Sequence, residues 1–223
     1  MISNILVDSV FAVEQYGELS GSLWDEEAAA LGPAATSRRC EFAAGRACAR
    51  SALAALGVPA QPILRGVHRE PLWPEGIVGS ITHCKGYSAA AVAYRDDVAS
   101  LGIDAEQNEP MPAGTLAVIA GAQEISLLQD LPCTNIHWDR LLFSAKESLY
   151  KAWFPLVKRW LGFEEVSVTI DPESGTFQFA NRTEGSRGGE FGHFGAGGRF
   201  IVQQGYILTS VIARPESGRN NRE

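Results

Sequence analysis

Residues 98 to 112 read VASLGIDAEQNEPMP, and this stretch decides how the chain of 223 residues is divided. Its first part, Val98 to Glu106, is predicted to be a β-strand, because apolar and polar residues alternate after Leu101. The strand cannot continue through the two prolines that follow, since proline lacks the amide hydrogen that a sheet needs. We therefore expect a hinge near residue 108, close to the middle of the chain.

The two halves have similar predicted content. Before the hinge we expect a strand over residues 5–13, a short helix that stops at Gly32-Pro33, a helix over 36–56, and a hairpin with strands 79–83 and 88–94. Beyond it we expect helices over 116–131 and 138–160 and strands over 164–170, 176–180, 200–202 and 206–213. These elements indicate an α+β fold with two similar subdomains, residues 1–108 and 109–213. A flexible tail, residues 214–223, and a glycine-rich surface loop, residues 185–198, complete the prediction.

Composition narrows the function classes. With 45% hydrophobic and 20% charged residues the chain is an ordinary globular protein, which excludes disorder, collagen and coiled coil as descriptions of the whole. The net charge of −7 argues against nucleic acid and anionic membranes as partners. No apolar run is long enough to span a bilayer, and the four cysteines show no CxxC spacing, so reduced thiols and a cytoplasmic location are expected.

Two carboxylates lie two residues apart in the central strand. Residues two apart on a strand share a face, so Asp104 and Glu106 point together while Ile103 and Ala105 face the core. Paired hard oxygens at a strand end suit Mg²⁺, which binds few carboxylates and completes its shell with water and phosphate. A solvated strand end with two exposed acids is the alternative that this pattern leaves open.

A second set of polar residues follows a helix. In the segment from Phe143 to Trp153, the residues Ser144, Glu147, Ser148 and Lys151 form one stripe at helical spacing, opposite an apolar face. From this stripe Glu147 could supply a third carboxylate to the metal, and Lys151 could supply an ammonium group that binds phosphate. The simpler alternative is an exposed Glu147–Lys151 pair at i,i+4, which stabilises a helix by about 0.2–0.5 kcal/mol.

Two further groups suit phosphate. Thr82 and His83 end a predicted strand, where they can donate hydrogen bonds to an anion, although a buried histidine fits equally well. A Cys84–His83 dyad is excluded, because neighbouring strand residues point to opposite faces.

Arginines also gather near the predicted helix over 36–56. Their forked guanidinium groups suit a compact phosphate, and a solvated helix face is the alternative. They are Arg38, Arg39, Arg46 and Arg50, followed by Arg65.

Taken together and in this order, these segments resemble the 4′-phosphopantetheinyl transferases of the surfactin-synthetase and enterobactin-synthetase type. The resemblance covers about residues 35–155 and runs through RRCEFAAGRACAR, PILRG, PLWPEGIVGSITHCKGYSAAAVA, LGIDAE and FSAKESLYKAW. It implies two α+β subdomains related by a pseudo-twofold, with coenzyme A in the cleft between them. It also implies transfer of the phosphopantetheine arm of coenzyme A to a serine of acyl- or peptidyl-carrier domains, releasing 3′,5′-ADP, as in polyketide and nonribosomal peptide biosynthesis.

The resemblance also implies roles for individual residues. Asp104, Glu106 and Glu147 would hold Mg²⁺, and Glu147 would take the serine proton directly or through a water. Lys151 would lie beside the transferred phosphate. His83 with Thr82 would contact the pyrophosphate, and Lys146 would also touch the substrate. Arg38, Arg46 and Arg65 match positions that meet the 3′-phosphate or the adenine side of the nucleotide.

Two other functions remain as alternatives. A metal-dependent phosphoesterase would use the same three acids, but it would usually need a second metal-binding cluster, which the sequence does not offer. A non-catalytic module that binds coenzyme A or a carrier domain would have no need of all of Asp104, Glu106, Glu147 and Lys151. Because two similar halves already enclose a cleft, a monomer is expected.

Overall fold

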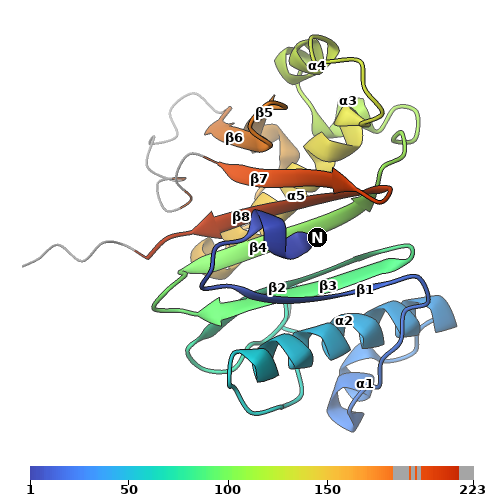
Figure 1. The fold of residues 1–223 in the computed structure, drawn as a ribbon, viewed down its shortest axis with the longest axis vertical. Helices are drawn as coiled ribbons and strands as arrows, with labels where there is room; N and C mark the ends of the chain where they lie inside the picture. Colours follow the sequence, from blue (N-terminus) through green and yellow to red (C-terminus); the bar gives the residue numbers. More distant parts are fainter. Residues whose placement is uncertain (183–190, 192–193, 195–196, 216–223) are drawn as a thin grey trace, which may run out of the picture.

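The computed structural model describes residues 1–182, 191, 194 and 197–215, and these form an α+β fold with two sheets. One sheet has three strands in the order β1-β3-β2, and the other has five in the order β4-β8-β7-β6-β5. All paired strands in both sheets are antiparallel. Figure 1 shows the two sheets side by side, with β2 and β4 at their junction.

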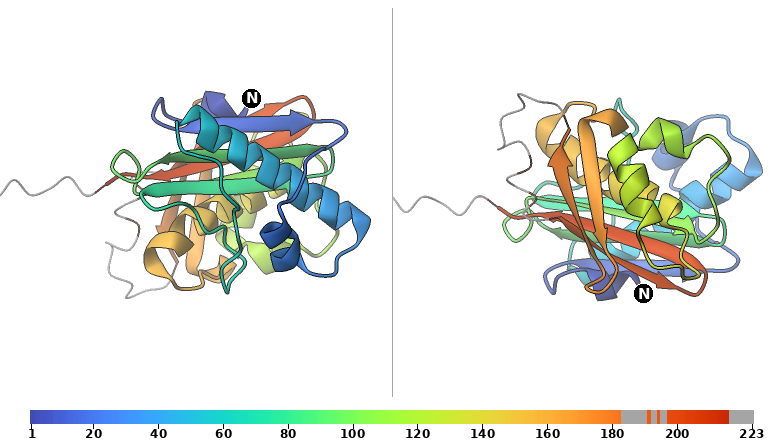
Figure 2. Two further views of the ribbon diagram at one scale, coloured as in Figure 1. Left: turned by 90° about the horizontal axis from the view of Figure 1, so that it is seen from below. Right: turned by 90° about the horizontal axis from the view of Figure 1, so that it is seen from above.

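The first lobe is built on the three-stranded sheet. A short 3-10 helix η1 (Ile2–Ile5) is followed by β1 (Phe11–Tyr16), α1 (Asp25–Leu31), α2 (Thr36–Ala55), β2 (Ile77–Cys84) and β3 (Tyr87–Tyr94). The long helix α2 lies across the outer face of this sheet (Figure 2). Its predicted apolar stripe is confirmed, since Phe42, Ala49, Leu53 and Leu56 are all buried.

The second lobe repeats this plan with a larger sheet. Its elements are β4 (Ser100–Gln107), α3 (Leu116–Ile119), α4 (Ala122–Gln129), α5 (Trp138–Val157), the 3-10 helix η2 (Phe163–Glu165), β5 (Val166–Asp171), β6 (Thr176–Asn181), β7 (Gly198–Gln203) and β8 (Tyr206–Ala213). Helices α2 and α5 have 20 residues each, and each packs on the sheet of its own lobe. Seen from above in Figure 2, α4 lies beside the β5–β6 hairpin.

The division between the lobes differs from the expected one at residue 108. Strand β4 pairs with β8 over its whole length, from Ser100 opposite Ala213 to Gln107 opposite Tyr206. The change of sheet therefore falls between Tyr94 and Ser100, before the strand, and the proline pair after β4 leads into α3 within the second lobe. The sequence pattern marked the end of the strand but not the sheet to which it belongs.

Three other boundaries differ from the predictions. The apolar run at residues 5–13 is interrupted by a turn in which the amide of Val10 donates to the carbonyl of Val7 (2.9 Å), so β1 begins only at Phe11. The helix expected over 116–131 is broken, because Ala120 and Gly121 are extended and a new helix begins at Ala122. Helix α5 ends at Val157 rather than at residue 160, because Lys158 is left-handed. The glycine-rich loop and the tail lie largely outside the described residues.

One apolar cluster joins the lobes. It combines Tyr87 and Ala89 of β3 with Leu101 and Ile103 of β4, and it also contains Leu208 of β8 and residues of η1. Each of the two remaining clusters lies mainly within one lobe, under α2 or under α5. The junction of β2 and β4 is therefore held by a shared core as well as by polar contacts.

Among the described helices, none is both long and apolar enough to cross a membrane.

Candidate functional site

Strands β2 and β4 run in parallel at the junction of the lobes and are linked by side-chain hydroxyls. The amide of Ile103 donates to Ser80 Oγ (3.1 Å), and the amide of Ala105 donates to Thr82 Oγ1 (3.0 Å). Helix α5 crosses the same strand at close range, because a Cβ on Gly102 would lie 1.9 Å from the carbonyl oxygen of Ser148. These contacts bring polar groups from three elements to one end of β4.

Asp104 lies at the centre of this group. Its carboxylate is buried, with 5% of the residue exposed. Oδ1 accepts hydrogen bonds from Lys151 Nζ (2.7 Å) and from the Thr82 hydroxyl (3.3 Å), and Oδ2 accepts one from the Ser144 hydroxyl (2.8 Å). Thr82 is thus committed to Asp104 and Ala105 and is itself buried. This placement differs from the expected pyrophosphate contact, because the hydroxyl orients Asp104 instead.

Glu106 follows on the same face of β4, as predicted. Arg140 at the start of α5 donates to its carboxylate (3.0 Å) and also to the carbonyls of Glu109 and Pro110. Burial and then the charge of Asp104 raise the pKa of Glu106 to about 7, against the opposing effect of Arg140. The sequence patterns did not single out Arg140, since nothing local connects it to a strand 34 residues away.

Glu147 and Lys151 approach Asp104 from α5. Burial is the main cause that raises the pKa of Glu147, and Asp104 adds to it while Lys151 opposes it. Lys151 donates to Asp104 and to the carbonyl of Ile103 (3.1 Å), so it bridges the helix to β4. The predicted polar stripe therefore faces the strand. It is not a solvent-exposed Glu147–Lys151 pair, and Ser144 and Ser148 are fully buried.

The three acids share one electrostatic environment. Asp104 raises the pKa of both Glu106 and Glu147, which means that ionising either one works against a neighbouring negative charge. Within the described ranges, no three acidic, histidine or cysteine side chains are grouped closely enough to hold a metal ion as they stand. The donor set still fits a hard divalent cation, since all three donors are carboxylates and a cation would relieve their repulsion.

His83 and Arg38 lie on the other side of the junction. Arg38 Nη1 lies 2.7 Å from His83 Nε2. Because a guanidinium group only donates, Nε2 is the acceptor and the imidazole is neutral. Burial is the main cause that lowers the pKa of His83, and the charge of Arg38 comes next. The ring is also 3.7 Å from the carboxylate of Glu41 on α2.

The arginines expected to bind phosphate gather around Phe42. The guanidinium groups of Arg46 and Arg65 lie 3.9 Å and 5.8 Å from the centre of its ring. Arg46 is 6% exposed and donates from Nε to the carbonyl of Ile63 (3.0 Å), but its Nη2 is buried with no partner among the described residues. Burial is the first cause that lowers the pKa of Arg46 to about 10, and neighbouring arginines contribute. Arg50 instead binds both carboxylate oxygens of Glu27 at 2.7 Å.

Lys146 is placed away from this site. Only 2% of the residue is exposed, and its ammonium pairs with Glu124 of α4 (2.9 Å). It also donates to three backbone carbonyls, at Ile119, Phe163 and Val166. All of its hydrogens are therefore engaged within the protein, which corrects the expected substrate contact. The partner Glu124 carried no sequence signal, because it is one acid among several in a short helix.

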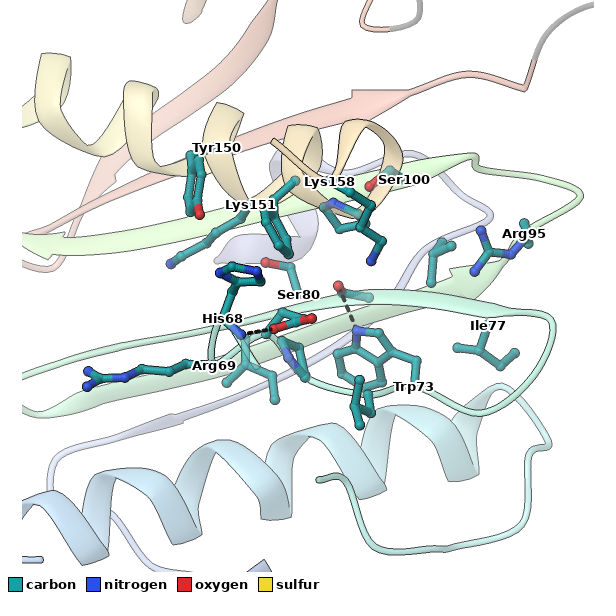
Figure 3. Close-up of a pocket in the computed structure, with 18 of the residues that line it drawn as sticks. His68, Arg69, Trp73, Ile77, Ser80, Arg95, Ser100, Tyr150, Lys151 and Lys158 are labelled. Carbon is teal, nitrogen blue, oxygen red and sulfur yellow. Dashed lines mark hydrogen bonds between the residues drawn. The ribbon is translucent and has the colours of Figure 1, made fainter. Parts of the chain in front are cut away.

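A cavity of about 390 Å³ opens beside Glu147 and Lys151. Figure 3 shows that it lies between the loop after Arg65, strand β2 and the second half of α5. Its walls are mainly apolar and include Trp73, Ile77 and Phe154. Of the site residues described above, Glu147 and Lys151 line this cavity between the lobes.

Sequence similarity to known proteins covers both lobes. A family model described as the 4'-phosphopantetheinyl transferase N-terminal domain matches residues 26–93, and one for the 4'-phosphopantetheinyl transferase superfamily matches residues 100–209. The 4'-phosphopantetheinyl transferase Svp of Streptomyces mobaraensis is 44% identical over 88% of this chain and 80% of its own length. PptT of Mycobacterium tuberculosis is 42% identical over 95% of this chain and 97% of its own. Enterobactin synthase component D of Salmonella typhi is 37% identical over 66% of this chain and 61% of its own.

Proposed function

The chain belongs to the 4′-phosphopantetheinyl transferase superfamily, and from this premise we propose which of its residues carry out the reaction. It is a transferase that moves the 4′-phosphopantetheine arm of coenzyme A to a serine hydroxyl of a carrier domain. The observation that supports our assignment of residues is the contact of Lys151 with Asp104, next to Glu147, at the junction of the lobes.

Asp104, Glu106 and Glu147 are the residues that would hold Mg²⁺. When bound there, the cation would stabilise negative charge on the pyrophosphate oxygens. Thr82 and Ser144 keep the two oxygens of Asp104 in place through their hydroxyls, and Arg140 does the same for Glu106. We assign these three residues to orientation rather than to substrate contact.

Glu147 is the proposed base. The serine oxygen forms a bond to the phosphorus that carries pantetheine, the bond from that phosphorus to the bridging oxygen breaks, and 3′,5′-ADP leaves. The serine proton must be taken up as this happens. Burial and the charge of Asp104 raise the pKa of Glu147, which makes its carboxylate a stronger proton acceptor than an exposed glutamate.

Cationic and neutral donors complete the site. The ammonium of Lys151 is proposed to donate to the transferred phosphate, where charge builds up during the reaction. His83 is proposed to contact the pyrophosphate as a neutral imidazole. The unpartnered Nη2 of Arg46, with Arg38 and Arg65 beside it, supports binding of the 3′-phosphate, since a buried donor without a partner costs free energy that an anion would recover.

The carrier domain is proposed to dock on residues 111–125. The chain carries a net charge of −7, so it offers no overall attraction for an acidic partner. Apolar contact is available in this segment, where the side chain of Val118 on α3 is 75% exposed. Reversal of charge in this segment without a change in carrier affinity would argue against it. A cytoplasmic, monomeric enzyme without nucleic acid or membrane partners stays a prediction.

One assay separates the possible functions. The protein is incubated with coenzyme A, Mg²⁺ and an apo-carrier domain, and the carrier is weighed by mass spectrometry. A gain of one phosphopantetheine, with release of 3′,5′-ADP, is expected. Hydrolysed coenzyme A with an unmodified carrier indicates a phosphoesterase instead, and a complex without any reaction indicates a binding module.

Glu147→Gln tests the proposed residue roles in the same assay. The amide keeps the size of the side chain but can neither accept the proton nor supply a negative charge, so transfer should be abolished while the melting temperature stays near that of the wild type. Glu26→Gln on α1 is the control, since this carboxylate is exposed and far from β4 in sequence. Near-normal turnover by Glu147→Gln would remove Glu147 from both of its proposed roles.

A further inference from the structure

A tight turn projects into the space between the lobes. Its base is closed by the amide of Leu72, which donates to the carbonyl of Leu64 (3.0 Å), and by the amide of Gly66, which donates to the carbonyl of Glu70 (2.8 Å). The carboxylate of Glu70 also accepts the amide hydrogen of His68 (3.0 Å). At the tip, the ring of His68 lies 5.0 Å from the ring of Phe154 on α5. The turn is therefore held by its own hydrogen bonds and by contact with the opposite lobe.

Arg69 occupies a backbone position in this turn that favours glycine. Its φ is +70°, in the left-handed region where a Cβ is unfavourable. The described residues contain two other non-glycine residues of this kind, and both have a local explanation: Lys158 ends α5, and Gln204 lies in the tight turn between β7 and β8. Strain of this sort in a turn next to a site is a reason to ask what the side chain does.

The guanidinium group of Arg69 makes no ion pair or hydrogen bond within the part of the chain that the structure describes. It lines the same cavity as Glu147 and Lys151. In Figure 3, Arg69 and Lys151 come from opposite lobes and extend toward the same side. Arg69 also acts on Arg65, whose pKa is lowered first by burial and then by the charges of Arg69 and Arg38. Arg69 thus lies close enough to Arg65, a member of the arginine group around Phe42, for their charges to act on each other.

We propose that Arg69 is a specificity-determining residue that binds the 3′-phosphate of coenzyme A together with Arg38, Arg46 and Arg65. The inference rests on the proposed function of those three arginines. Like charges gathered in one place repel one another, and the carboxylate of Glu41, which lies 3.5 Å from Arg38, offsets only part of this positive charge. A phosphate monoester carrying two negative charges would relieve the remaining repulsion and match the forked geometry of guanidinium groups. We assign the 3′-phosphate rather than the pyrophosphate because Arg69 lies in the turn that the Arg65–Pro71 bridge closes, and Arg65 belongs to the arginine group around Phe42.

The test compares coenzyme A with 3′-dephospho-coenzyme A as substrates for Arg69→Gly. Glycine accepts the left-handed backbone, so the melting temperature should not fall. Loss of one charge-assisted contact at an exposed position should raise KM for coenzyme A roughly tenfold. KM for the dephosphorylated substrate and kcat with both substrates should stay within about twofold of the wild type. Arg69→Lys, which keeps the charge but not the fork, should lie between the two.

Arg95→Ala is the matched control, because Arg95 is an exposed arginine that lines the far end of the same cavity. It should change neither KM. An equal rise of KM for both substrates in Arg69→Gly, or no rise for coenzyme A, would overturn the proposal. Binding of 3′,5′-ADP and of 5′-AMP, measured by calorimetry, keeps this test separate from catalysis: Arg69→Gly should weaken only the first, even if the wild type transferred nothing.

Discussion

The ammonium of Lys151 lies 2.7 Å from Oδ1 of Asp104, and it links the middle of α5 to the acidic end of β4. Asp104 is buried, and its charge raises the pKa of both Glu106 and Glu147, so the ammonium of Lys151 offsets negative charge at the centre of this acidic group. In the substrate complex, the same ammonium is positioned to meet phosphate.

Lys151→Met should cost both stability and activity. A buried carboxylate that loses its partner is destabilising, and because the Lys151 side chain is 27% exposed we expect about 1–2 kcal/mol rather than the 3–5 kcal/mol of a fully buried pair. Loss of a donor to the transferred phosphate should lower kcat by about 10²–10³-fold. Thermal melting and steady-state kinetics measure the two effects. Lys85→Met, at an exposed lysine in the turn between β2 and β3 that does not line the cavity, is the control and should change neither.

Glu106 should make stability fall as pH rises. Its pKa is raised from 4.5 to about 7 in the folded protein, so between these values the folded state binds more protons than the unfolded state. The free energy of unfolding should therefore decrease from about pH 4.5 to about pH 7 by a few kcal/mol at most. Urea titrations at several pH values without divalent cation test this. Glu106→Gln should flatten that part of the profile, and an unchanged profile would contradict the assignment.

Removal of the divalent cation should stop transfer, and the affinity of the protein for the cation should depend on pH. A carboxylate must be ionised to bind a cation, so the apparent affinity for Mg²⁺ should rise with pH up to about the pKa of Glu106. Chelation by EDTA should abolish activity, and added Mg²⁺ should restore it. Activity that survives complete chelation would contradict the three-carboxylate site.

Gly102→Ala should separate α5 from β4. The added Cβ would lie 1.9 Å from the carbonyl oxygen of Ser148 and 2.7 Å from the amide nitrogen of Ala152, and backbone atoms cannot move aside cheaply. We expect a loss of about 3 kcal/mol and lower kcat, because Glu147 and Lys151 would shift with the helix. Gly45→Ala on α2 is the contrast: its Cβ would meet side-chain rather than backbone atoms, Cγ2 of Ile81 at 2.9 Å and Oγ of Ser88 at 3.8 Å, so its effect should be smaller than that of Gly102→Ala.

Lys146→Met should affect stability and leave substrate binding intact. It breaks a buried ion pair, but Glu124 keeps the amides of Gly121 and Val168 and the guanidinium of Arg182 as partners, so we expect about 2–4 kcal/mol. Calorimetry on the folded variant should give the wild-type affinity for coenzyme A. A large loss of affinity for coenzyme A in a variant that melts normally would indicate instead that Lys146 contacts the substrate.

The sequence predicted side-chain positions best where a single helix or strand determines them. Strand alternation placed Asp104 and Glu106 on one face, and helical spacing placed Ser144, Glu147 and Lys151 on another, because both depend only on local periodicity. Pairings between elements were not accessible in this way. Arg140 meets Glu106 and Lys146 meets Glu124 only after the chain has folded, and neither partner is set by spacing.

Thr82 shows the same limit. Its residue type fits a phosphate contact and also fits a bridge between strands, and the choice depends on β4, which packs beside β2 without belonging to its sheet. The position of the lobe boundary was missed for the same reason, since a proline pair marks the end of a strand and says nothing about the partner of that strand.

The apolar cluster that combines η1, β3, β4 and β8 has a consequence for how the protein unfolds. The lobes cannot separate without exposing this cluster to water. The two halves are therefore expected to unfold together in a single calorimetric transition. Fragments ending near Tyr94 or beginning near Ser100 should aggregate when expressed separately, and mixing them is the condition under which native protein should form.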